Sequence, residues 1–130
     1  MIFEFKNYTV DVYEGKRGGV FVIPFEAIEK LFSFDTEGKY CIEIEFSVGG
    51  YPRYSSCWMG KLPDKDDPTK EVYWYGLVDD GSEGYGYDNF EDFSSTPVFG
   101  GRSLKEVWEN VELLAIDGCD PKDRLRVYLE

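Results

Sequence analysis

Hydrophobic and polar side chains alternate through the middle of the chain with the two-residue period of a β-strand. The apolar positions are Tyr40, Ile42, Ile44, Phe46 and Val48. Because successive side chains of a strand point to opposite faces of its sheet, this pattern predicts a half-buried strand over 40–48. Gly49-Gly50 then favours a two-residue hairpin turn, which would pair Val48 with Tyr51, Phe46 with Arg53, Ile42 with Cys57 and Tyr40 with Met59. This register puts Cys41 and Cys57 on opposite faces, where a disulfide between them is geometrically poor.

Shorter runs of aromatic and β-branched residues predict the other strands. Residues 2–6 and 8–13 form one strand or two, and further strands are predicted over 20–23, 71–78 and 111–116. Side chains also alternate over 125–129, which predicts a closing strand. A short helix capped by Asp120, with Pro121 at its first position, is the alternative there. Residues 14–19 predict a turn, and 61–70 a long polar loop with two prolines, three aspartates and three lysines.

Two segments have the spacing of amphipathic helices. Pro24 suits the first turn of the first helix, which should end near Ser33 and whose apolar positions are Phe25, Ile28, Leu31 and Phe32. Ser103 and Glu106 form a capping box, in which each side chain accepts a hydrogen bond from the other residue's N–H. The second helix should follow at once, with the apolar stripe Leu104, Val107, Trp108 and Val111.

Together these elements predict an α+β fold: a mainly antiparallel sheet of about six or more strands, with two amphipathic helices packed on one face. Strands predominate and follow one another as hairpins, and neither helix lies within a clear parallel βαβ unit. A chain of 130 residues suits one domain that buries about two thirds of its unfolded surface. We therefore expect residues 1–130 to form a single domain.

The residue types present exclude several kinds of chemistry. The chain has no histidine, which excludes Cys–His and Ser–His nucleophiles, and its three cysteines show no CxxC spacing. The acids after Asp79 miss the EF-hand pattern, because Gly81 occupies the third position and Phe90 the twelfth. Glu43 and Glu45 share the polar face of their predicted strand, which favours a solvated surface over a glycosidase pair. We expect no enzyme activity, no metal, no cofactor and reduced cysteines.

Negative charge is concentrated in one part of the chain. The net charge is −12 at pH 7, and between Glu71 and Gly101 there are seven acids, eight aromatic residues and no lysine or arginine. Such charge disfavours direct binding to nucleic acid or to an anionic membrane and favours a basic protein partner. Aromatic rings among glycines and acids are typical of recognition surfaces. The predicted partner-binding residues are Asp79, Asp80, Glu83, Tyr85, Tyr87, Asp88, Glu91 and Asp92.

In size and composition the chain resembles bacterial toxin-immunity proteins as a class. The leading hypothesis is therefore an immunity or inhibitor protein that neutralises a basic partner such as a toxin or nuclease. One alternative is a small-ligand-binding module, which an apolar, aromatic-lined pocket with few acids at its mouth would favour. Another is a nucleic-acid mimic, with carboxylates spaced along an elongated face. Because Glu4 lies where a signal peptide would be basic, we expect a cytoplasmic protein.

Overall fold

The structure of the chain is a computed structural model that describes residues 2–5, 8–11, 13–14, 21–78 and 80–129. The strands among these residues are β1 (Ile2–Phe5), β2 (Tyr8–Asp11), β3 (Tyr13–Glu14), β4 (Phe21–Val22), β5 (Ile42–Val48), β6 (Cys57–Pro63), β7 (Glu71–Leu77), β8 (Glu83–Tyr87) and β9 (Val111–Ile116). The α-helices are α1 (Phe25–Leu31), α2 (Phe90–Ser95), α3 (Leu104–Val107) and α4 (Pro121–Leu129), and the 3₁₀ turns are η1 (Pro52–Tyr54) and η2 (Trp108–Asn110). The α+β class is confirmed.

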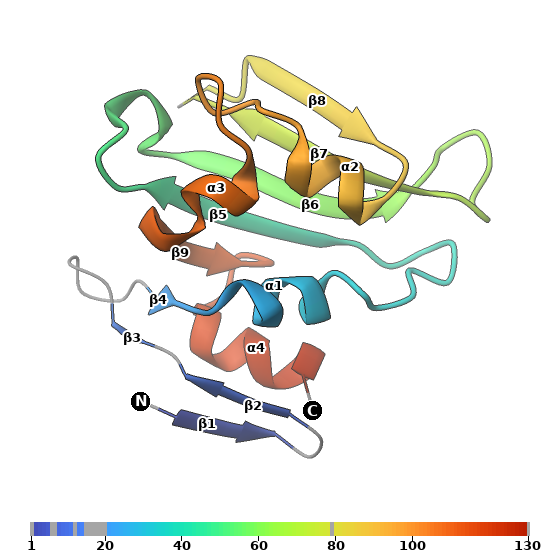
Figure 1. The fold of residues 1–130 in the computed structure, drawn as a ribbon. Helices are drawn as coiled ribbons and strands as arrows, with labels where there is room; N and C mark the ends of the chain where they lie inside the picture. The colour runs from blue at the N-terminus through green and yellow to red at the C-terminus, as the bar shows by residue number, and fades with distance from the viewer. Residues whose placement is uncertain (1, 6–7, 12, 15–20, 79, 130) are drawn as a thin grey trace.

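An antiparallel sheet forms the centre of the molecule (Figure 1), with the strand order β3-β4-β9-β5-β6-β7-β8. Strands β9, β5, β6, β7 and β8 have five to seven residues each and make up the body of the sheet. Strands β3 and β4 have two residues each, and β1 pairs with β2 in a separate hairpin. Because β8 is the last strand in the order, one of its edges has no neighbouring strand from the described part of the chain.

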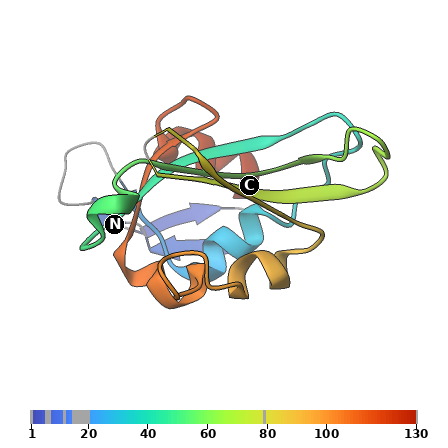
Figure 2. The same ribbon diagram turned by 90° about the horizontal axis from the view of Figure 1, so that it is seen from above.

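Helices α1, α2 and α3 lie along one face of the sheet, as Figure 2 shows. The side chains of Ile42, Ile44 and Phe46 on β5 are fully buried. Burying a side chain of this size stabilises the fold by about 1.5–3 kcal/mol. The indole N–H of Trp108 donates to the carbonyl oxygen of Ile23 at 2.7 Å and so fixes the chain just before α1. Helix α4 contacts β9 and α1, so the described residues contain four α-helices rather than the predicted two.

The predicted capping box is present at the start of α3. The Ser103 hydroxyl accepts from the Glu106 N–H at 3.2 Å, and a Glu106 carboxylate oxygen accepts from the Ser103 N–H at 2.9 Å. The helix is nevertheless short, because the chain tightens into η2 and then enters β9. Val111 therefore begins a strand instead of completing a helical stripe.

The β5–β6 connection is longer than predicted. Phe46 pairs with Cys57 instead of Arg53, and Ile42 pairs with Lys61 instead of Cys57, so that the partner moves by four positions in both pairs. Pro52 has no N–H to donate to a strand ladder, and it begins η1 instead. Since the shift is an even number of residues, each side chain keeps its predicted face: Cys57 is buried and Cys41 is exposed.

Two polar segments differ from their prediction. Strand β6 extends to Pro63, so the polar loop is shorter than the predicted 61–70. The last residues form α4, with Pro121 in first position, instead of the closing strand. A helix lets Leu125 be fully buried against the core while Val127 stays 62% exposed, whereas a strand would place both side chains on the same face.

The remaining strand predictions are confirmed where the structure describes them. Strand β7 covers all but the last residue of the predicted 71–78, and β9 covers 111–116. Strands β1, β2 and β4 lie within the predicted N-terminal strands. The predicted turn over 14–19 lies outside the described residues beyond Glu14.

Candidate protein-binding surface

The predicted partner-binding residues lie on and around the edge strand β8 (Figure 1). Asp80 precedes β8, whereas Asp88, Glu91 and Asp92 follow it, and Asp79 lies outside the described residues. A five-residue strand spans about 13 Å between its first and last Cα atoms. The exposed acids are therefore divided between the two ends of the edge strand instead of forming one cluster.

The two tyrosines of β8 differ in their surroundings. Tyr87 is partly buried, and its ring lies edge-on to Tyr75 and Phe93 at centroid distances of 6.2 and 6.4 Å. Tyr75 in turn donates its hydroxyl proton to the Phe93 carbonyl oxygen at 2.6 Å, and its burial raises the pKa of that hydroxyl. Tyr85 is 39% exposed. Tyr85 is thus the tyrosine of β8 that is accessible to a partner, while Tyr87 belongs to the packing under α2.

Glu83 has an ion-pair partner that the sequence did not reveal. Arg53 of η1 places Nη2 3.0 Å from one carboxylate oxygen and Nε 3.3 Å from the other. The hydrogen bond and the charge of Glu83 raise the pKa of the Arg53 guanidinium. The segment from 71 to 101 lacks lysine and arginine, but the fold brings Arg53 to it from an earlier turn. The lack of lysine and arginine between 71 and 101 therefore does not leave Glu83 without an ion-pair partner.

Asp92 takes part in the start of helix α2. Asn89 is the N-cap residue, and its side-chain oxygen accepts from the Asp92 N–H at 2.8 Å. The Asn89 side-chain nitrogen donates to the Asp92 carboxylate at 3.0 Å. Both Glu91 and Asp92 lie in the first turn, where the positive end of the helix dipole favours carboxylates. The carboxylate of Asp92 thus has a structural role of its own.

Asp88 and Glu91 differ from these acids because their carboxylates form no hydrogen bond or ion pair with the described residues, and only the dipole of α2 favours that of Glu91. Both residues are exposed. The Asp80 carboxylate forms one local hydrogen bond, which it accepts from the Ser82 N–H at 2.9 Å. Hydrogen bonds from the Ser82 hydroxyl and N–H hold the pKa of Asp80 below its usual range. All three carboxylates present their charge to solvent.

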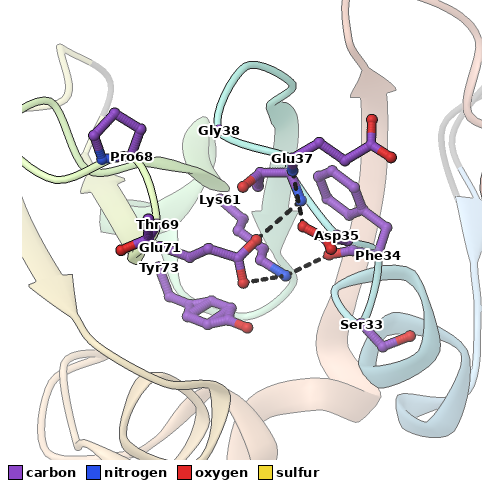
Figure 3. A pocket seen from close by; sticks show the side chains of 11 residues that line it. Ser33, Phe34, Asp35, Glu37, Gly38, Lys61, Pro68, Thr69, Glu71 and Tyr73 are labelled. Carbon is purple, nitrogen blue, oxygen red and sulfur yellow. Dashed lines mark hydrogen bonds and ion pairs between the residues drawn. The ribbon is translucent and has the colours of Figure 1, made fainter.

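A second polar site, which sequence analysis missed, lies at the start of β7 (Figure 3). Lys61 on β6 is only 2% exposed. Its ammonium donates to the carbonyl oxygens of Phe32 at 3.0 Å and Phe34 at 2.5 Å, and it lies 3.1 Å from a Glu71 carboxylate oxygen. The rings of Phe34 and Tyr73 have their centroids 4.9 and 5.1 Å from the same nitrogen. Since an ammonium has three N–H donors, every donor of Lys61 already has an acceptor.

Glu71 joins this buried ammonium to the main chain after α1. Its second carboxylate oxygen accepts from the Thr36 N–H at 3.0 Å. Burial alone would raise the pKa of Glu71, but the hydrogen bonds from Thr36 and Lys61 outweigh it and hold the pKa below its usual range. Phe32 is the C-cap of α1, where helix carbonyls lack intrahelical donors. The Lys61–Glu71 pair therefore fastens the end of α1 to the sheet.

A hollow of about 660 Å³ adjoins the Lys61–Glu71 pair (Figure 3). It is open to solvent, and its lining includes the carboxylates of Asp35, Glu37 and Glu71 beside the ring of Phe34. A small-ligand-binding module was expected to have an apolar cavity with few acids at its mouth. This hollow has three acids in its lining and a lysine whose donors are all used, so it gives that alternative little support.

Comparison with known proteins adds no constraint on either site, since no family model, curated protein or solved structure matches the chain. Within the described residues, no group of three or more His, Cys, Asp or Glu side chains is placed to hold a metal ion. Each helix that the structure describes is too short or too polar to cross a membrane.

Proposed function

We propose that this protein is a non-catalytic, acidic protein-binding domain, and that it acts as an immunity or inhibitor protein for a basic partner such as a bacterial toxin or nuclease. The observation that supports this function is the pair of exposed carboxylates, Asp88 and Glu91, which have no partner among the described residues and follow the edge strand that carries the exposed ring of Tyr85. The fold uses the acids Glu71 and Glu83 in ion pairs. It makes no such use of Asp88 and Glu91, so their charge is available to a partner.

The physical basis of the proposal is complementary charge combined with an aromatic anchor. A protein that binds or cleaves nucleic acid needs a basic surface, because phosphates are negative. Exposed carboxylates on a chain of net charge −12 attract such a surface over long distances and raise the rate of association. An exposed tyrosine then supplies apolar contact area at low entropic cost, which slows dissociation. A nucleic-acid mimic would need a continuous row of carboxylates, whereas here Tyr85 lies between two acidic ends.

Charge reversal tests the role of the carboxylates. The variant Asp88→Lys/Glu91→Lys is compared with Glu29→Lys/Glu43→Lys, which makes the same change in net charge at exposed positions elsewhere. The binding probe is the protein encoded beside this gene, with association followed by biolayer interferometry at low and high salt. We expect the first variant to associate at least about tenfold more slowly and with a weaker salt dependence, and the control to remain close to wild type. An equal decrease in the association rate of both variants would show that only the net charge of the protein matters.

The anchor is tested separately through dissociation. Tyr85→Ala should dissociate from the same probe at least about tenfold faster, because truncating a central interface aromatic mainly changes the dissociation rate. Tyr40→Ala is the matched control, since Tyr40 is also exposed, at 52%, but lies away from β8. Circular dichroism of both variants checks that the fold is retained. An unchanged dissociation rate for Tyr85→Ala would contradict the assignment of Tyr85 as an anchor.

A further inference from the structure

The outer edge of β8 is an unpaired strand edge. On its inner side β8 pairs with β7 from Tyr73–Tyr87 to Leu77–Glu83 without a register shift. No described strand follows it in the sheet, and Figure 1 shows no element beyond it. Among the described residues, no main-chain hydrogen bond outside the strand pairs and helices involves residues 83–87. The outward N–H and C=O groups of β8 are therefore available to another strand.

This edge lacks the features that usually prevent strands from pairing with other chains. Natural edge strands are protected by lysine, by proline, by a bulge or by a covering segment. Strand β8 reads Glu-Gly-Tyr-Gly-Tyr, with no lysine and no proline, and its ladder to β7 has no bulge. Gly84 and Gly86 leave one face of the strand without side chains, and neither has a positive φ that would distort the strand. The edge is suited to accept a strand.

We infer that β8 binds an extended basic segment of the partner as an added β-strand. This inference rests on the proposed function and specifies how the partner docks. An added strand pairs its main chain with β8, and these hydrogen bonds contribute affinity, while the side chains decide which strand binds. Lysine or arginine side chains of that strand then meet Asp80 at one end of β8 and Asp88 and Glu91 at the other. On the tyrosine face, the exposed ring of Tyr85 offers a cation–π surface to the same side chains.

Charge decides between a basic partner and a second copy of this chain. Two β8 edges paired with each other would bring the acids at the ends of both strands together. Like charges that face each other across a strand pair are destabilising, and each chain has a net charge of −12. A basic strand would instead bring positive side chains next to these acids, so that the interaction across the strand pair is attractive. The occupant that fits this edge is therefore a cationic extended segment.

The test uses three nine-residue probe peptides with the full-length protein. The first alternates lysine and valine and readily forms a strand. The second has the same lysines and therefore the same charge, but prolines take the place of the valines and are arranged in adjacent pairs, which removes N–H donors from both edges of the peptide. The third alternates glutamate and valine. Affinity is measured by calorimetry at low salt, amide hydrogen exchange of residues 83–87 is followed by NMR, and sedimentation without peptide reports the oligomeric state.

The inference predicts that the lysine–valine peptide binds at least about tenfold tighter than the proline peptide and slows amide exchange in β8 by at least about tenfold. The glutamate peptide should not bind. Equal affinity of the two cationic peptides, with no protection of β8, would overturn strand addition while leaving charge-based docking intact. Failure of both cationic peptides to bind would instead count against the proposed function itself. A dimer in sedimentation with protected β8 amides would show that a second copy is the occupant.

Discussion

The Lys61–Glu71 pair connects β7 to β6, and β8 borders β7 on its other side. The pair and the outer edge of β8 treat polar groups in opposite ways. At the first, each donor of the ammonium has an acceptor, and Glu71 also accepts from the Thr36 N–H. At the second, the outward main-chain groups and the carboxylates of Asp88 and Glu91 have no partner among the described residues. A polar group that is satisfied inside the fold contributes to stability, and one that is left open at the surface is free to bind.

The difference separates two kinds of acid that look alike in the sequence. Glu71 and Glu91 both belong to the stretch without lysine or arginine, yet only Glu71 is held by the fold. Substitutions at the buried pair should therefore change stability with little effect on the β8 edge. Substitutions at the edge should change binding with little effect on stability.

The largest loss in the free energy of unfolding is expected for Lys61→Met. Methionine retains the apolar stem, but it leaves the carbonyl oxygens of Phe32 and Phe34 and the carboxylate of Glu71 without their donor. Removing one partner of a buried ion pair costs about 3–5 kcal/mol, and the exposed side of Glu71 places this case near the lower figure. Urea unfolding measures the change, and Lys65→Met in the exposed loop should stay within about 0.5 kcal/mol of wild type. A loss below about 1 kcal/mol would show that the site does not hold α1 to the sheet.

Glu71→Gln should cost less, about 2 kcal/mol at pH 7, and should change the response to acid. The folded pKa of Glu71 lies below its ordinary value of 4.5. A lowered carboxyl pKa contributes stability that is present above the unfolded pKa and is lost as pH falls through the folded pKa. The difference in unfolding free energy between wild type and Glu71→Gln should thus narrow as pH is lowered below about 4.5. Urea titrations at several pH values check this, and a constant difference would contradict it.

Sequence analysis recovered the elements whose signals are local. The alternation in β5, the spacing in α1 and the capping box at Ser103 each depend on neighbouring residues, and each is found in the structure. Features that depend on distant segments were missed, such as the contact between Arg53 and Glu83. The predicted pairing of β5 with β6 was wrong because Pro52 begins a 3₁₀ turn after Gly49-Gly50, which lengthens the connection between the two strands.

Lys61 shows why the candidate site was harder to predict than the fold. A lysine among prolines and aspartates indicates a loop, and only its position two residues after Met59, on the buried face of β6, reveals the strand. Extending the alternation from Cys57 through Met59 would have placed Lys61 in the core. Its need for acceptors would then have pointed to Glu71, the first acid of the following strand. The acceptors in the loop after α1 could not be foreseen, because they are carbonyl oxygens that carry no sequence signal.

Asp92→Ala should lower the free energy of unfolding by an intermediate amount, about 1 kcal/mol. The substitution removes the carboxylate that accepts from the Asn89 side chain and a negative charge from the first turn of α2. Thermal unfolding measures the loss of stability. The affinity of β8 for the lysine–valine peptide should fall by less than in Asp88→Lys/Glu91→Lys, because the Asp92 carboxylate already interacts with Asn89 and with the N-terminus of α2. An unchanged stability would show that Asp92 belongs with the unused acids of the edge.

The smallest effect on stability is expected for Asp88→Asn/Glu91→Gln. Neither carboxylate has a partner among the described residues, so neutralising them breaks no contact and should change the free energy of unfolding by no more than about 0.5 kcal/mol. At low salt the loss of Asp88's charge should be stabilising, because it is removed from a chain that repels itself at a net charge of −12, whereas the same gain at Glu91 is offset by the loss of its favourable interaction with the α2 dipole. Screening shortens the reach of charge from about 10 Å at 0.1 M salt to about 3 Å at 1 M, so this gain should disappear at high salt. Urea unfolding at both salt concentrations checks the prediction. A loss of more than about 1 kcal/mol would show that these acids support the fold, and the contrast between the two sides of β7 would then fail.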